Sequence, residues 1–280
     1  MRRTQYSFIL GLGLFIGCIM YLVFKPSKEH YYPKKQDIVF ITFGGGGENY
    51  YKAVERILQE ADGMNIFSKR IGVLDTDLKK DRFFWDRMGT FIETHRRGYG
   101  YWCWKSYIIW RQLLNMSTGD ILIYLDSGCT FNKDGRERLL KWISDFESKQ
   151  LDIQMTTACV EHCTERRWTK RAILDYFQVP EEERDRHQYG GGIVFVRKSD
   201  KTIRFFKELF DLFVTHPHLP TDETSSEEDP KFVENRHDQS LFSCMLYHKK
   251  DTIRTQVIFD GSLMSKDIDP KAPILVTRYR

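Results

Sequence analysis

Two acidic residues stand at positions where a carboxylate could do chemistry. Asp126 follows the apolar run Ile121–Leu125 and precedes Ser127-Gly128, so a buried strand would end on this carboxylate. Carboxylate oxygens in such a place ligate hard divalent cations, often together with phosphate oxygens. An aspartate that only caps a turn has the same surroundings, and the spacing leaves both interpretations open.

The second acidic residue is Asp238, which lies in the motif Arg236–Ser243 (RHDQSLFS) at the start of an apolar helix. A carboxylate there can act as a base, as a nucleophile or as a stabiliser of transition-state charge, with His237 and Gln239 beside it. The alternative is structural, because aspartate is also a common N-cap of helices.

Two further motifs contain groups that bind ligands. The stretch Arg96–Lys105 (RRGYGYWCWK) combines aromatic rings, which stack on a base or a sugar, with cations that meet phosphates. Tyr189–Gly192 (YGGG) precedes an apolar run, and its glycines allow a ligand to approach the backbone. Core packing and a simple turn are the competing explanations.

The segments that must position these motifs alternate between strand and helix patterns. The expected strands are 37–43, 68–74, 121–125 and 193–197, and the expected helices are 50–61, 81–95, 105–114, 135–148 and 203–214. Such alternation predicts a mainly parallel α/β sheet that is covered by helices on both faces. Ligands then bind at the carboxyl ends of the strands. Residues 221–230 (TDETSSEEDP) read as a mobile acidic surface loop.

Residues 6–24 contain no charged side chain, and these 19 residues can span the hydrocarbon core of a bilayer as one helix. No small-residue cleavage site follows, so we expect an uncleaved signal-anchor. The predicted organisation is a tail over 1–5, a transmembrane anchor over 6–24, a stem over 25–36 and one domain over 37–280. We expect a single-pass type II membrane protein whose domain lies in the lumen of the Golgi or the ER.

The net charge of +4 belongs to the N-terminal segment. Six basic residues and one acidic residue lie within 1–36, which leaves residues 37–280 at −1. A nucleic-acid-binding domain would carry its basic residues on the fold itself, so nucleic acid is excluded as a partner.

The domain holds five cysteines, an odd number, and Cys159, His162 and Cys163 lack the second ligand pair of a structural zinc site. Asn115-Met116-Ser117 is a glycosylation acceptor sequence.

The order of these motifs resembles that of the nucleotide-sugar glycosyltransferases with the GT-A fold, over about residues 37–250. The densest matches are RGYGYWCWK, GDILIYLDSGC, ERRWTK over 165–170, YGGGIVFVRK and RHDQSLFS. The resemblance is to a poorly characterised branch of that superfamily. It implies a GT-A-like, Rossmann-like sheet whose first half binds the nucleotide.

The resemblance also implies a D-x-D motif that holds Mn²⁺ or Mg²⁺ on the diphosphate. The matching positions are Asp126 to Gly128, so the second acid is missing and metal dependence is in doubt. Asp126 is the one metal ligand predicted, with basic side chains as the other means of neutralising phosphate. The nucleotide-sugar candidates are Thr42, Asp75, Arg97, Tyr99, Lys105 and Asp126. The basic residues Arg278 and Arg280 could contact phosphate, but a solvated tail is the favoured interpretation of these two.

By the same resemblance, Asp238, Gln239 and His237 are the catalytic candidates. Gly191, Gly192, Trp168 and Lys170 are the acceptor-side candidates. The predicted reaction moves a hexose from a nucleotide diphosphate sugar, a UDP-sugar by preference, to a hydroxyl group of a glycan or glycoprotein, with retention favoured over inversion. Two alternatives stay open: a non-catalytic sugar- or nucleotide-binding relative, and a glycoside hydrolase that uses two carboxylates.

Overall fold

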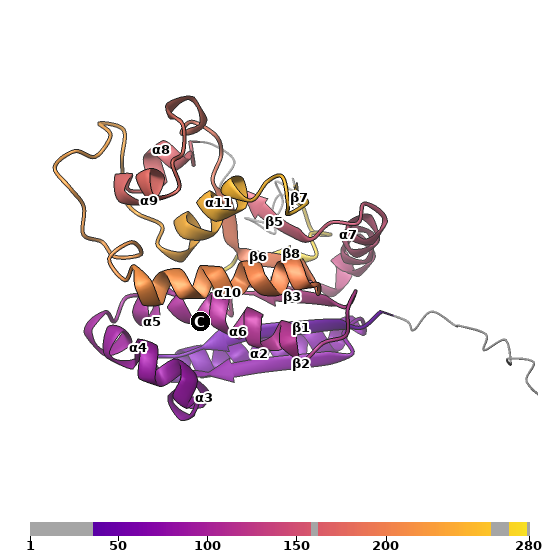
Figure 1. The fold of residues 1–280 in the computed structure, drawn as a ribbon. Coiled ribbons are helices and arrows are strands. Elements are labelled where there is room, and N and C mark those ends of the chain that lie inside the picture. Colours follow the sequence, from indigo (N-terminus) through magenta and orange to yellow (C-terminus); the bar gives the residue numbers. More distant parts are fainter. Residues whose placement is uncertain (1–35, 158–161, 259–268, 279–280) are drawn as a thin grey trace, which may run out of the picture. The chain divides into compact units, whose positions relative to one another are not determined.

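A six-stranded sheet in the order β2–β1–β3–β6–β5–β7 organises the computed structural model, which describes residues 36–157, 162–258 and 269–278 (Figure 1). The strands are β1 (Ile38–Gly44), β2 (Lys69–Leu74), β3 (Ile121–Leu125), β5 (Ile153–Thr157), β6 (Tyr189–Arg197) and β7 (Thr255–Ile258). Short strands β4 (Thr130–Phe131) and β8 (Ile274–Leu275) pair separately.

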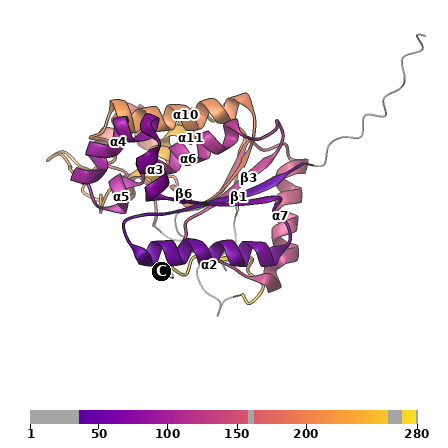
Figure 2. The ribbon, with the colours of Figure 1, turned by 90° about the horizontal axis from the view of Figure 1, so that it is seen from below.

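Helices cover both faces of the sheet. They are α2 (Glu48–Met64), α3 (Asp75–Lys80), α4 (Arg82–Thr94), α5 (Gly98–Tyr101), α6 (Cys103–Leu114), α7 (Arg136–Ser148), α8 (Glu165–Trp168), α9 (Arg171–Tyr176), α10 (Asp200–Thr215) and α11 (Asp238–His248). In Figure 2, α2 and α7 lie on one side of the strands, and α6, α10 and α11 lie on the other. The predicted mixed α/β architecture is therefore confirmed.

Successive side chains along a strand point to opposite faces of the sheet, and the molecule therefore has one apolar core on each face. Leu122 and Tyr124 of β3 pack with α6 and α10, whereas Ile121, Ile123 and Leu125 pack with α2 and α7. All five residues are fully buried, as expected for a strand that is covered on both faces. The next residue, Asp126, has the parity of Tyr124 and so belongs to the α6 face.

One strand departs from the predicted parallel arrangement. β6 runs antiparallel to both β3 and β5, with Leu125 opposite Ile193. The strand also begins at Tyr189, earlier than the expected 193, so the three glycines lie within it. An antiparallel strand starts at the edge where its neighbour ends, and Gly192 therefore lies beside Asp126.

The predicted anchor over 6–24 and the stem, apart from Gln36, lie outside the residues that the structure describes. Among the helices of 36–157, 162–258 and 269–278, none is long and apolar enough to cross a membrane. The described residues form one compact unit that starts at Gln36.

Candidate functional site

A buried ammonium group joins the two acidic motifs of the sequence. Lys105 Nζ lies 2.7 Å from Asp238 Oδ2 and 3.4 Å from Asp126 Oδ1. It also donates a hydrogen bond to the carbonyl oxygen of Gly191 at 3.1 Å. The Lys105 ammonium of α6 thus contacts three other stretches of sequence, namely the end of β3, β6 and α11.

Asp126 directly follows β3. One of its carboxylate oxygens accepts a hydrogen bond from the protein, and the other is accessible. The Tyr124 hydroxyl donates to Oδ1 at 2.5 Å, and the Asp126 amide donates to the carbonyl of Gly192 at 2.9 Å. The side chain is 43% exposed. A Cβ atom added at Gly192 would lie 3.1 Å from Asp126 Oδ2, so the absence of a side chain there keeps this oxygen open.

Asp238 is the first residue of α11, and its side chain is only 12% exposed. Burial raises the pKa of Asp238 to about 6, even though Lys105 opposes the shift. The preceding His237 adopts a left-handed φ of 54°, which turns the chain into the helix. Its ring stacks 5.5 Å from that of Trp102, Nδ1 lies 2.7 Å from the Pro220 carbonyl, and burial lowers its pKa.

Lys105 stays charged inside the protein. Burial lowers the pKa of this ammonium, but the carboxylates of Asp126 and Asp238 outweigh burial and raise it above its ordinary value. Three protons of an ammonium group match three oxygen partners here, namely two carboxylates and the carbonyl of Gly191. Lys105 therefore fixes the positions of both acids and has no N–H group left for a ligand.

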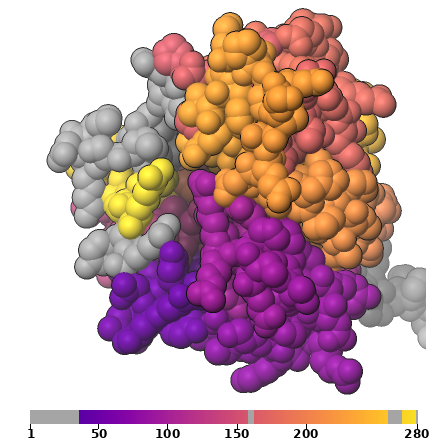
Figure 3. Space-filling model, turned by 90° about the vertical axis from the view of Figure 1, so that its left-hand side faces the viewer, coloured from indigo at the N-terminus to yellow at the C-terminus, as the bar shows by residue number. Residues whose placement is uncertain are grey.

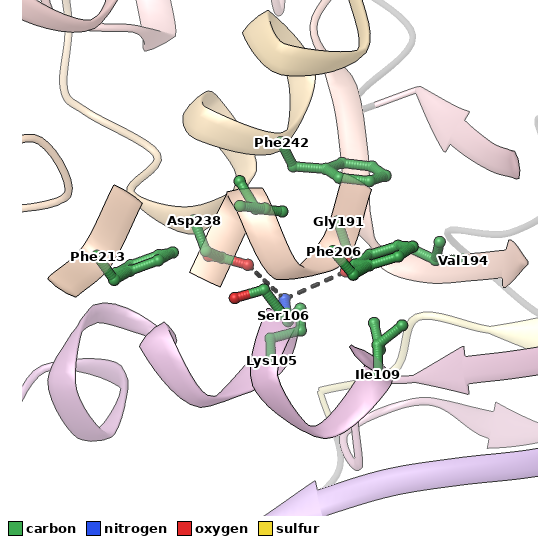
Figure 4. A pocket seen from close by; sticks show the side chains of 10 residues that line it. Lys105, Ser106, Ile109, Gly191, Val194, Phe206, Phe213, Asp238 and Phe242 are labelled. Atoms are coloured by element: carbon green, nitrogen blue, oxygen red, sulfur yellow. Dashed lines mark hydrogen bonds and ion pairs between the residues drawn. The ribbon is translucent and has the colours of Figure 1, made fainter. Parts of the chain in front are cut away.

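A pocket lies beside this ion pair on the α6 face of the sheet, and Lys105 and Asp238 are among its lining residues (Figure 4). Lys105, Ser106 and Asp238 form its polar end, and the rest of the wall is mostly apolar, with Ile109, Val194, Phe206, Phe213 and Phe242. The phenylalanines come from α10 and α11, which keep water away from the buried side of Asp238. This apolar wall contributes to the burial that raises the pKa of Asp238.

Gln239 connects α11 to the sheet and to a buried acid that the sequence analysis did not single out. Its Oε1 accepts from the Gly191 amide at 3.2 Å, and its Nε2 donates to Gln188 Oε1 at 2.6 Å. Gln188 Nε2 in turn lies 3.3 Å from Oε2 of Glu165, which is 0% exposed and also accepts from Ser243. Gln239 is thus held by the protein and orients the strand that carries Gly191.

The predicted nucleotide residues that come from β1, α3 and α5 gather at the ends of β1 and β2, with one exception. Asp75 accepts from the Tyr51 hydroxyl at 2.6 Å and from the Gly46 amide at 3.4 Å, and the Tyr99 ring lies 5.9 Å from that of Phe43. Thr42 is the exception. It is 0% exposed, and its hydroxyl donates to the Leu125 carbonyl inside the sheet, so it faces no ligand.

Arg97 is paired with carboxylates of the acidic loop and of the segment that follows it. Its Nη1 lies 2.7 Å from Asp222 Oδ1, and its Nη2 lies 3.7 Å from Glu234 Oε2. The Tyr101 hydroxyl donates to the other oxygen of Asp222 at 2.8 Å. The loop predicted to be mobile is therefore attached at Asp222 to the aromatic-basic motif.

The two acceptor-side candidates of the ERRWTK motif have different surroundings. Trp168 is partly exposed, and the Arg236 guanidinium lies 4.0 Å above its ring. Lys170 is 2% exposed and donates to the carbonyls of His218, Thr221 and Glu223. Lys170 thus holds the start of the acidic loop, and it does not face the Lys105 centre. The motif alone did not distinguish these roles.

Among the residues that the structure describes, the donor set at Asp126 does not fit a divalent cation. Position 128 is a glycine, and the partner that faces both Asp126 and Asp238 is itself a cation. Within the three described ranges, no group of three or more His, Cys, Asp or Glu side chains is placed to hold a metal ion. A cation bound to both acids would have to displace the Lys105 ammonium.

Comparison with known proteins gives structural similarities only. No family model and no curated protein matches the chain. The fold is similar to a glycosyltransferase involved in glycosylation of the major capsid of PBCV-1 (11% identity, 80% of this chain and 94% of the other, TM-score 0.38).

It is also similar to apo mouse xyloside xylosyltransferase 1 (11% identity, 79% and 85%, TM-score 0.41). A third match is the galactosyltransferase LgtC, solved with donor and acceptor sugar analogs (10% identity, 75% and 70%, TM-score 0.41). The function proposed below rests on the residues of this chain.

Proposed function

We propose that the protein is a glycosyltransferase that moves a hexose from a nucleotide diphosphate sugar, a UDP-sugar by preference, to a hydroxyl group of a glycan or glycoprotein. The observation that supports this best is the meeting of Asp126 and Asp238 on one ammonium at the carboxyl end of β3. The ends of β1 and β2, with Asp75 and Tyr99, border the same edge, which is where open α/β sheets bind nucleotides.

The side chains divide into a nucleoside part and a sugar part. Asp75 and Tyr99 offer a carboxylate and a ring to the ribose and the base. The open oxygen of Asp126 and the bare backbone of Gly192 face the sugar. Asp238 lies deeper, at the buried end, where a carboxylate acts strongly on charge that develops nearby because water is excluded.

In the reaction we propose, the C1–O bond of the donor breaks and its electron pair leaves on the diphosphate. The acceptor oxygen bonds to C1 and passes its proton to an oxygen of that diphosphate. The ionised Asp238 stabilises the positive charge at C1. Because acceptor and leaving group meet on one face of the sugar, the configuration at C1 is retained.

The experiment compares two aspartates that both begin a helix. Asp238→Asn should lower transfer from its donor by at least about 100-fold, the low end of what one group that stabilises transition-state charge contributes, while UDP binding persists. Asp200→Asn, at the exposed start of α10, is the matched control and should retain activity. Donors are screened first by release of the nucleoside diphosphate. Full turnover by Asp238→Asn would disprove the assignment.

A glycoside hydrolase remains the second candidate, because the two carboxylates are close enough to share one ammonium. Glycosidase carboxyls lie about 5–10 Å apart, so distance does not remove this option. Lys105 argues against it, since a hydrogen-bonded ammonium favours the ionised form of Asp238 and a general acid must be protonated. An assay with aryl glycosides distinguishes the glycosyltransferase from the hydrolase. An enzyme that hydrolyses aryl glycosides but transfers no sugar from nucleotide sugars would be a hydrolase.

We further propose that the domain works in the lumen of the secretory pathway, anchored through residues 6–24. Cys163 is disulfide-bonded, and disulfides persist in oxidising compartments. Asn115 of the acceptor sequence is exposed at the end of α6. Glycosidase treatment of the protein from secretory cells tests the location: a mobility shift that Asn115→Gln abolishes supports the lumen, and an unmodified chain with reduced Cys163 contradicts it.

A further inference from the structure

The leaving diphosphate of the proposed reaction needs a cation, and the structure leaves open which one. Negative charge that develops on a leaving group is usually stabilised by a metal ion or by basic side chains. The donor set at Asp126 does not fit a metal, and the three N–H groups of Lys105 are engaged by Asp126, Asp238 and Gly191. Another basic group must therefore face the phosphates.

Arg236 is the first such group, two residues before Asp238. Its guanidinium carbon lies 4.0 Å from the centre of the Trp168 ring, a contact that holds the side chain in place. Its one ion pair with a described residue is to Glu234 at 3.3 Å. A guanidinium has five N–H donors, so most of them stay available to an anion.

Arg278 is the second group, on the segment that follows β8. The segment crosses the turn after β3: the Thr277 hydroxyl donates to the Gly128 carbonyl at 3.0 Å, and a Cβ at Gly128 would lie 3.3 Å from Arg278 Cα. Arg278 has a left-handed φ of 53°, is exposed and pairs with none of the carboxylates in the described ranges. The position where a D-x-D motif has its second acid is thus covered by a basic residue.

The two arginines act on each other. Burial lowers the pKa of Arg236, Glu234 opposes this shift, and Arg278 and Arg97 add to it. Glu234 pairs with both Arg236 and Arg97 and offsets part of the repulsion between these cations, and an entering polyanion offsets the repulsion from Arg278 as well. In Figure 3 the yellow C-terminal segment lies next to a hollow that the indigo, purple and orange segments also border.

On the basis of the proposed function, we propose that Arg236 and Arg278 bind the diphosphate of the donor in place of a divalent cation. Their guanidinium groups form charge-assisted, bidentate hydrogen bonds to phosphate oxygens. Asp126 then serves as an anchor for Lys105 and as a partner of the sugar. Gly128 is small because the Arg278 backbone passes over it.

Calorimetric titration of the full chain with UDP, uridine and inorganic pyrophosphate tests this assignment. Each titration is done in excess EDTA and again with Mn²⁺. We expect the wild type to bind UDP and pyrophosphate in EDTA, with Mn²⁺ changing Kd less than about threefold. Arg236→Ala and Arg278→Ala should each weaken UDP and pyrophosphate by about 10- to 100-fold and leave uridine unchanged, as expected for charge-assisted hydrogen bonds.

Arg204→Ala is the matched control, because Arg204 is exposed on α10 away from this site and should bind all three probes like the wild type. An unchanged Kd for uridine shows that a variant is folded. The inference is overturned if the wild type binds UDP only with Mn²⁺, or if both arginine variants bind pyrophosphate like the wild type. A wild type that binds none of the probes overturns the proposed function itself, and the inference with it.

Discussion

Replacing Lys105 by methionine should move the acid limb of the pH–rate profile toward higher pH. The wild-type limb is expected near pH 6, because burial raises the pKa of Asp238 to about 6 and the ionised carboxylate is the active form. Lys105 lies 2.7 Å from Asp238 Oδ2. An opposite charge at such a distance lowers a carboxyl pKa by about 1–3 units. Without it, the limb should lie at about pH 7–9.

The pKa of Asp238 rises in Lys105→Met because the substitution removes a charge that favours the ionised carboxylate. Burial disfavours the carboxylate and Lys105 favours it, so loss of Lys105 removes the largest effect that opposes burial. Asp126, also negative, then adds to the shift in the same direction. Each unit corresponds to about 1.4 kcal/mol against the ionised form. Activity at pH 6.5 should therefore fall more than activity at pH 9.

The assay measures kcat/KM from pH 5 to pH 10 for the wild type, Lys105→Met and the exposed control Lys201→Met, which should follow the wild type. A Lys105→Met profile that is scaled down at every pH, with its limb still near pH 6, would refute the electrostatic account. In that case Lys105 would act through packing or through direct contact with substrate. Asp238→Asn should show no limb at all in its residual rate.

Two further predictions concern packing around the site. Gly192→Ala should lower kcat by about tenfold, since its Cβ would lie 3.1 Å from Asp126 Oδ2. Gly191→Ala would make contacts no closer than 3.5 Å and should be tolerated. Steady-state kinetics on both variants test this, and equal losses of kcat would contradict it. Lys170→Met should lower the free energy of unfolding by about 3 kcal/mol, because buried carbonyls lose their donor; a denaturant titration with an unchanged midpoint would count against it.

The local patterns of the sequence predicted the elements that carry the first half of the fold. The apolar run Ile121–Leu125 is long enough for one buried strand and ends on Asp126, and the structure places it so. Helix 135–148 was likewise expected from its 3.6-residue periodicity and is observed as α7. These features depend on contacts within one element, which periodicity reports directly.

The direction of β6 was not predictable in the same way. A strand pattern is the same read in either direction, and only its connections decide whether it runs with or against its neighbour. The antiparallel direction brings Gly192 to Asp126, an encounter that a parallel strand would have prevented. Gly191 and Gly192 were expected on the acceptor side, and the structure adds their contact with the Lys105 centre.

Roles that depend on distant partners were the hardest to predict. Lys170 and Glu165 belong to one motif, yet Lys170 holds loop carbonyls and Glu165 joins a buried network through Gln188. Thr42 follows a strand pattern at a position where ligands often bind, but its hydroxyl donates to Leu125 inside the sheet. A single sequence carries no sign of such partners, because they lie 23 to 83 positions away along the chain.

The crossing of the C-terminal segment over the Asp126 turn has a consequence for the order of folding. Thr277 meets Thr130 across 147 positions and Gly128 across 149. Contacts so distant in sequence have a high loop-closure entropy and form late. A refolding chain should therefore regain its helical signal before it can bind a polyanion. The site would be completed last, after the sheet beneath it is already in place.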